Sequence, residues 1–80
     1  MKAKIHVTLK PGILDPQGKA IEHALDSLGF KNVANVRVGK YMELDLDQSD
    51  MAKAEAEVKG MCEKLLANTI IEEYRYELQG

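Results

Sequence analysis

The sequence predicts an α+β protein of two layers, in which a three-stranded, mainly antiparallel sheet carries both helices on one face. Segments 3–9, 36–47 and 70–78 alternate apolar and polar residues with the period of two that is typical of half-buried strands. Segments 16–28 and 51–67 repeat apolar residues at every third or fourth position, as amphipathic helices do. Because each segment has a single apolar face, the order strand, helix, strand, helix, strand is best buried as one sheet layer and one helix layer. This arrangement resembles a ferredoxin-like split unit whose two middle strands have fused.

The central segment, Val36 to Asp47, is predicted to be one continuous strand. Its alternation does not change phase at Gly39-Lys40, a dipeptide that would otherwise suggest a two-residue hairpin turn. Such a turn would place the apolar residues before and after it on opposite faces, which is a costly slip of register. A three-residue loop would keep the faces matched, but it would need its left-handed residue at Lys40 rather than at Gly39. We therefore expect no reversal here, and at most a kink at the glycine.

A strand of this length has a consequence for association. At about 3.3 Å per residue it reaches roughly 40 Å, which is about twice the usual length. An 80-residue domain cannot easily cover both ends, and the uncovered end exposes unpaired backbone groups and an apolar face. A second copy of the chain is the simplest cover. The sequence therefore predicts a subunit that associates, with its long central strand shared with a neighbouring subunit.

The first helix has clear signals at both ends. Asp15 is the expected N-cap, and Pro16 occupies the first helical position, where its missing N–H is harmless. The helix is expected to end near Leu28, with Gly29 in the left-handed conformation after it. Its predicted buried stripe consists of Ala20, Ile21, Ala24, Leu25 and Leu28.

The second helix has weaker signals. Ser49 is the expected N-cap, with Asp50 favourable in the first turn. The helix is expected to reach about Ala67, and Asn68 is expected to end it in the left-handed conformation. Gly60 inside the helix lowers the stability of the helix by up to about 1 kcal/mol relative to alanine. A close approach of another backbone would explain this glycine.

Length and composition limit the classes of protein to which the chain can belong. The chain is one domain, residues 1–80, and a domain of this size buries only about 60% of its unfolded surface, so association helps its stability. A hydrophobic fraction of 45% argues against disorder. There is no apolar run long enough to span a membrane and no signal-like segment after Met1. With Cys62 as the single cysteine, a reduced, cytoplasmic setting is expected.

The charge is uneven along the chain. Residues 1–40 contain seven Lys/Arg and three Asp/Glu, which gives +4, whereas residues 41–80 contain four and ten, which gives −6. A nucleic-acid binder usually has a basic face with stacking aromatics, and this chain has neither. Complementary patches that meet a partner and a simply well-solvated surface both remain consistent with the pattern.

No constellation of residues indicates catalysis or a metal site. His6, His23 and Cys62 do not have the spacing of metal ligands, and no histidine is locally placed to activate the thiol. The acidic residues between 43 and 50 alternate outward, which favours a solvated face over an acid–base pair. Lys40 interrupts an apolar strand face, so it is expected to reach a partner's carboxylate, a helix C-terminus or water.

Five stretches carry a family resemblance when they are taken together and in order. They are 7–10 (VTLK), 14–18 (LDPQG), 36–41 (VRVGKY), 61–68 (MCEKLLAN) and 71–76 (IEEYRY). Together they resemble the PurS family, the small subunit of phosphoribosylformylglycinamidine (FGAM) synthase. No single stretch is specific, but their conjunction covers nearly the whole chain at the length of the family.

The resemblance implies a place in an enzyme complex of de novo purine biosynthesis. That complex converts formylglycinamide ribonucleotide (FGAR), ATP, glutamine and water into FGAM, ADP, phosphate and glutamate. A glutaminase subunit, PurQ, releases ammonia, and a large synthetase subunit, PurL, uses ATP and Mg²⁺. PurS holds no active site and no cofactor. It forms a homodimer or tetramer, bridges PurQ and PurL, and supports transfer of ammonia between them.

The resemblance also selects candidate contacts with partner subunits: Asp15, Pro16, Gln17, Gly18, Arg37, Gly39, Lys40 and Tyr41. A well-formed helix cap explains the first four equally well. Cations in the middle of a strand have no obvious local role, which favours Arg37 and Lys40 as contacts.

Two other functions compete with this one. The two-layer architecture also suits an ACT-type regulatory module that binds an amino acid or a nucleotide. A free-standing enzyme that uses His6, His23 or Cys62 is the third hypothesis.

Overall fold

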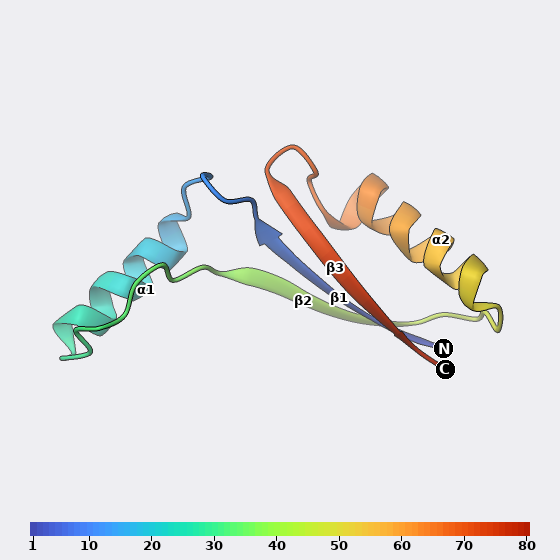
Figure 1. Ribbon diagram of the computed structural model, residues 1–80, viewed down its shortest axis with the longest axis horizontal. Helices are drawn as coiled ribbons and strands as arrows, with labels where there is room; N and C mark the ends of the chain where they lie inside the picture. The colour runs from blue at the N-terminus through green and yellow to red at the C-terminus, as the bar shows by residue number, and fades with distance from the viewer.

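The chain, described over residues 1–80 by a computed structural model, forms one three-stranded antiparallel sheet with two helices (Figure 1). Its elements in order are β1 (Lys2–Leu9), α1 (Pro16–Ser27), β2 (Gly39–Asp45), α2 (Met51–Met61), a π-helical turn η1 (Cys62–Leu66) and β3 (Glu72–Gln79). The strand order is β2-β1-β3, and both pairings of β1 are antiparallel. These observations confirm the predicted α+β class and the order of the elements. No helix is both long and apolar enough to cross a lipid bilayer.

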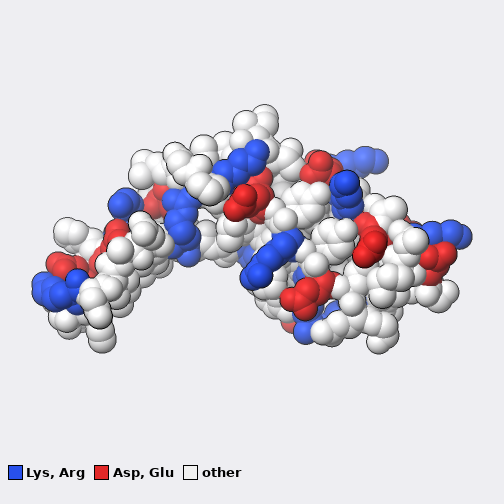
Figure 2. Space-filling model, viewed as in Figure 1, with Lys and Arg blue, Asp and Glu red and all other residues white.

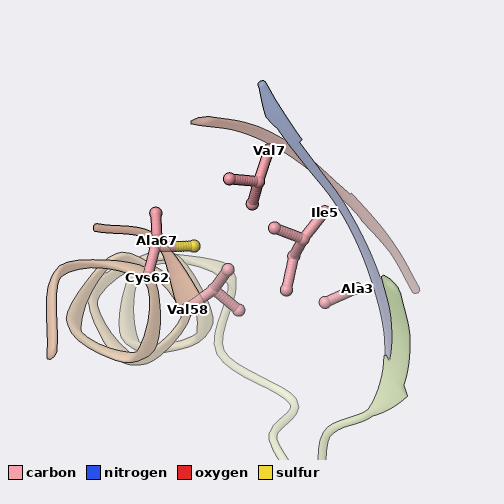
Figure 3. Packing of buried hydrophobic residues seen from close by; sticks show 6 residues of the cluster. All are labelled: Ala3, Ile5, Val7, Val58, Cys62 and Ala67. Carbon is pink, nitrogen blue, oxygen red and sulfur yellow. The ribbon is translucent and has the colours of Figure 1, made fainter. Parts of the chain in front are cut away.

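The core lies between β1 and α2. The alternation of β1 directs Ala3, Ile5 and Val7 to one face of the sheet, where each is at most 1% exposed. Positions 54, 58 and 62 recur at every fourth residue, so these side chains lie on the side of α2 and η1 that packs on this face. The resulting cluster is small (Figure 3), and it consists of Ala3, Ile5, Val7, Val58, Cys62 and Ala67.

The first helix does not join this core, which differs from the expectation that both helices cover one face of the sheet. In Figure 1, α1 and the segment that returns from it extend away from the sheet. The radius of gyration is 16.1 Å, against about 12 Å for a compact chain of this length. Three strands about 4.8 Å apart make a face roughly 14 Å wide, and α2, with a diameter of roughly 10 Å, already occupies it. We refer to residues 16–38, which comprise α1 and the returning segment, as the arm.

The central extended segment runs through Gly39 without a turn. Gly39 pairs with Thr8 at the start of β2, and the pairing continues to Asp45 opposite Lys2. The hairpin alternative is therefore excluded, because a turn at Gly39 would leave no room for this register. The hydrogen-bonded strand is shorter than the predicted 36–47, since β2 covers 39–45. Residues 36–38 precede it as the end of the arm.

The predicted ends of α1 are confirmed. Asp15 is the N-cap, Pro16 is the first helical residue, and Gly29 has a left-handed φ of 99°. The amide of Phe30 donates to the carbonyl of Leu25 at 3.0 Å, and that of Gly29 donates to Asp26 at 3.1 Å. These two bonds form a Schellman motif, which satisfies carbonyls that the helix end leaves free.

The two predicted capping residues of α2 need correction. The N-cap is Asp50 and not Ser49, because the Asp50 side chain accepts hydrogen bonds from the amides of Ala52 and Lys53 at 2.9 and 3.3 Å. The helical segment continues through η1 to Leu66, as the expected end at about Ala67 requires, but Asn68 does not have a positive φ. Ala67 is extended there, and the Asn68 side chain starts a turn instead by accepting from the Ile70 amide.

Gly60 has no close neighbour within the chain, since a Cβ built on it meets no atom within 4 Å. The expected close approach of another backbone is therefore absent from the chain itself. We predict that Gly60→Ala raises the free energy of unfolding by up to about 1 kcal/mol, because alanine loses less conformational freedom in a helix. Urea denaturation monitored by circular dichroism measures this. A decrease in stability would contradict the prediction and would point to a partner backbone close to this residue.

Candidate partner interface

The carboxylate of Asp15 joins the two chain segments at the base of the arm. One oxygen, Oδ1, accepts a hydrogen bond from the Gly18 amide at 2.9 Å, which caps α1. The other, Oδ2, accepts from the amide of Val38 at 2.8 Å, one residue before β2. Asp15 is only 4% exposed. It therefore links the start of α1 to the end of the returning segment, in addition to capping the helix.

These hydrogen bonds stabilise the charged form of Asp15. The amides of Val38 and Gly18 lower the pKa of its carboxyl group, and the positive charge of Arg37 acts in the same direction. A lowered pKa means that the carboxylate stabilises the folded chain fully above its unfolded pKa of about 3.9. This stabilisation is lost as the pH falls through the lower folded value.

Gly18 allows the same two segments to touch backbone to backbone. A Cβ at this position would overlap the carbonyl oxygen of Val36. No larger residue fits unless the returning segment moves. Gly18 is buried within its own chain. Because it has no side chain, the start of α1 and the returning segment can lie in direct contact.

Arg37 has a local role that the sequence did not indicate. Its guanidinium donates from Nη1 to the carbonyl of Ile13 at 2.9 Å and from Nη2 to that of Lys10 at 3.1 Å. Both acceptors belong to the connection between β1 and α1, and the Lys10 amide in turn donates to the Ile71 carbonyl. The planar fork of an arginine suits two such acceptors, which a single lysine cation would not bridge as well.

Lys40 and Tyr41 point to opposite faces of the sheet. The Nζ of Lys40 in β2 lies 3.9 Å from a carboxylate oxygen of Glu72 in β3, and β1 runs between these two strands. Lys40 therefore has an acidic partner within its own chain. The ring of Tyr41 packs on His6, with centroids 4.7 Å apart. Burial and the neighbouring Glu43 raise the pKa of the Tyr41 hydroxyl. Glu72 was missed from the sequence, although it interrupts the apolar face of the third strand just as Lys40 interrupts that of the second.

The structure brings the two predicted groups of site residues together. A cavity of about 260 Å³ is lined by residues of the helix start and of the β2 start, which include Asp15, Pro16, Gln17, Gly39 and Lys40. Of the eight candidates, Asp15 and Gly18 are buried within the chain. The other six have exposed surface: Pro16, Gln17, Arg37, Gly39, Lys40 and Tyr41.

The arm exposes the apolar stripe that was predicted to be buried. Ile21 is 44% exposed, Leu28 is 72% exposed and Phe30, just after the helix, is 56% exposed. Ile21 and Leu28 are seven residues apart and so share one side of the helix, and exposed apolar side chains on one side indicate a surface that another molecule covers. Sequence reasoning identified the stripe correctly but assigned it to the chain's own core. The length of the central segment was the one signal that pointed outside the chain.

The three residues of the free-standing-enzyme hypothesis lie on three different elements. His6 lies on the polar face of the sheet, His23 lies on α1 and Cys62 is buried on the other face of the sheet. Burial raises the pKa of the Cys62 thiol, which keeps it protonated at neutral pH. No group of three or more His, Cys, Asp or Glu side chains is placed to hold a metal ion. Basic and acidic side chains are intermingled over the surface in Figure 2, so this face has no large area of one sign.

Known proteins similar to this chain agree on one family. The family model described as "PurS: Phosphoribosylformylglycinamidine (FGAM) synthase" matches residues 2–80. The PurS subunit of Bacillus subtilis is 55% identical over 98% of this chain and 92% of its own length. The PurS subunit of a Synechocystis strain is 48% identical over 94% of this chain and 75% of its own length.

Solved structures give the same result. A crystal structure of Bacillus subtilis PurS matches with a TM-score of 0.89 and 54% identity, over 99% of this chain and 98% of that one. A chain in the structure of PurLQS from Thermotoga maritima matches with a TM-score of 0.86 and 34% identity, over 95% of this chain and 93% of that one. These comparisons give no support to the ACT-type alternative. The chain belongs to the PurS family of phosphoribosylformylglycinamidine synthase subunits.

Proposed function

We propose that this chain is the non-catalytic assembly subunit of FGAM synthase, which associates with itself and bridges the glutaminase PurQ and the synthetase PurL. The observation that carries the proposal is the arm, whose apolar stripe is left uncovered by the chain's own sheet. The related chain in a PurLQS structure supports the same assignment. The reaction of the complex is conversion of FGAR, ATP, glutamine and water into FGAM, ADP, phosphate and glutamate. A cytoplasmic location fits this role.

A second copy of the chain is the proposed cover for the stripe of α1. A helix with exposed leucine and isoleucine is stabilised when an equivalent apolar surface packs on it. The outer edge of β2 is also unpaired, because β1 is its only neighbour in the sheet. A symmetric pair of arms would bury both stripes at once, since in a two-fold interface every contact occurs twice. Homodimer and tetramer both satisfy this requirement.

The partner subunits are proposed to meet the exposed residues at the base of the arm. These are Pro16, Gln17, Arg37, Gly39, Lys40 and Tyr41, while Asp15 and Gly18 shape the backbone beneath them. ATP and Mg²⁺ are assigned to PurL, and release of ammonia to PurQ. The chain is proposed to align PurQ and PurL so that ammonia released by PurQ reaches the synthetase site of PurL.

Reconstitution tests the proposal. PurQ and PurL from the same organism are mixed with and without this chain, and glutamine-dependent formation of FGAM is measured. We expect synthase activity that requires the chain, together with a complex that contains all three proteins by size-exclusion chromatography with light scattering. A parallel assay with an ammonium salt in place of glutamine is the control, because ammonia supplied from solution does not need the bridge. Equal glutamine-dependent activity with and without the chain would overturn the proposal.

A further inference from the structure

The arm is joined to the rest of the chain by very few contacts. No packed interface joins α1 to the sheet or to α2, whereas α2 packs against β3. Asp15 and Arg37 make four hydrogen bonds at the base of the arm. Because α1 does not pack on the sheet or on α2, these hydrogen bonds are the contacts from which we argue the direction of the arm.

The geometry of these bonds restricts the direction of the arm. Asp15 holds the start of α1 to Val38, and Arg37 holds the returning segment to the carbonyls of Lys10 and Ile13. The connection that carries these carbonyls is itself attached to the sheet edge through the Lys10 amide. Gly18 permits the two segments to lie in direct contact. All of these links therefore act at the point where the arm leaves the sheet.

We propose that Asp15 and Arg37 form a latch that fixes the direction of the arm relative to the sheet, and that this preorganised direction presents the stripe of α1 to its partner. Asp15 is a positioning residue in this account, because its carboxylate is buried and holds backbone amides of its own chain. The functional part of the inference rests on the proposed function. Preorganisation of the arm strengthens association because the arm loses less freedom on binding.

Asp15→Ser is the variant that separates the latch from the helix cap. Serine is also a good N-cap, so it keeps the hydrogen bond to the first turn of α1, but its short hydroxyl does not reach the Val38 amide as well. Asp50→Ser is the matched control. Asp50 is the N-cap of α2, and both of its hydrogen bonds stay within that helix. Circular dichroism confirms that both variants keep their helices.

The direction of the arm is measured by electron paramagnetic resonance. Spin labels are attached at Asp26→Cys in α1 and Glu77→Cys in β3, in a Cys62→Ala background. Labelled chain is diluted into excess unlabelled chain, so that only distances within one chain are read. We expect one narrow distance distribution in the background chain and in Asp50→Ser, and a broadened distribution in Asp15→Ser. A distribution that is equally narrow in all three would overturn the latch.

A titration of chain into PurQ and PurL tests the functional part. For Asp15→Ser, we expect the chain concentration that gives half-maximal glutamine-dependent activity to rise at least tenfold, with an unchanged plateau at saturation. Broadened distances with an unchanged half-maximal concentration would overturn the role of the latch in assembly. Failure of the unsubstituted chain to support activity would overturn the proposed function instead, and the distance measurement would still decide whether the latch exists.

Discussion

Ile21→Glu is expected to convert the homo-oligomer into monomers and to abolish glutamine-dependent synthase activity. Ile21 lies on the exposed stripe of α1, and burial of an isoleucine side chain contributes about 1.5–3 kcal/mol. In a two-fold interface the loss occurs twice, and each glutamate also loses water when it is buried. We therefore expect the dissociation constant of the homo-oligomer to rise at least about a hundredfold.

Sedimentation velocity over a range of concentrations measures this change. His23→Glu is the matched control, because it adds the same charge to the same helix on the side opposite Ile21. The control is expected to stay associated and active. If Ile21→Glu associated as tightly as the unsubstituted chain, the stripe would not be the self-association surface.

Gly18→Ala is expected to lower the free energy of unfolding by about 1–3 kcal/mol, the usual cost of forcing extra volume into a packed site. The new Cβ would overlap the Val36 carbonyl oxygen, so either α1 or the returning segment has to move. That movement also lengthens the hydrogen bond between Asp15 and Val38. Because a backbone carbonyl is the obstacle, rotation of a side chain does not relieve the contact.

Gly60→Ala is the natural control for this variant. Both substitutions add one methyl group at a helical glycine, but only Gly18 faces a backbone atom. Urea denaturation of both variants, at a concentration where the parent is fully associated, is expected to show opposite signs. A Gly18→Ala chain as stable as the parent would mean that the close contact with Val36 is not present in solution.

The parts of the fold that local chemistry controls were predicted well. The caps of α1 at Asp15 and Gly29 follow from residue types whose backbone preferences act within one turn. The alternation of β1 predicted that Ala3, Ile5 and Val7 lie in the core, because successive side chains of a strand point to opposite faces of the sheet. The unbroken phase at Gly39 excluded a hairpin for the same reason.

Errors arose where several residues compete for one role. Ser49 and Asp50 are both good N-caps, and the choice between them depends on how Gln48 turns the chain before α2. Asn68 often adopts a left-handed conformation, but here its side chain makes a turn with Ile70. The local hydrogen bonds of Arg37 were not predicted, because no acceptor lies near it in sequence. Its acceptors are carbonyls more than twenty residues away, which only the folded chain brings close.

Residue order alone was enough to predict the order of the elements, the apolar face of each one and the family of the chain. These properties depend on periodicity and on side-chain type, which are local and can be read along the chain. The position of the α1 stripe became clear only in the folded chain. An apolar stripe needs to be buried, but periodicity does not say against what. Because α2 fills the one apolar face of a three-stranded sheet, α1 is held away from it, and a surface predicted to be core became the surface proposed for association.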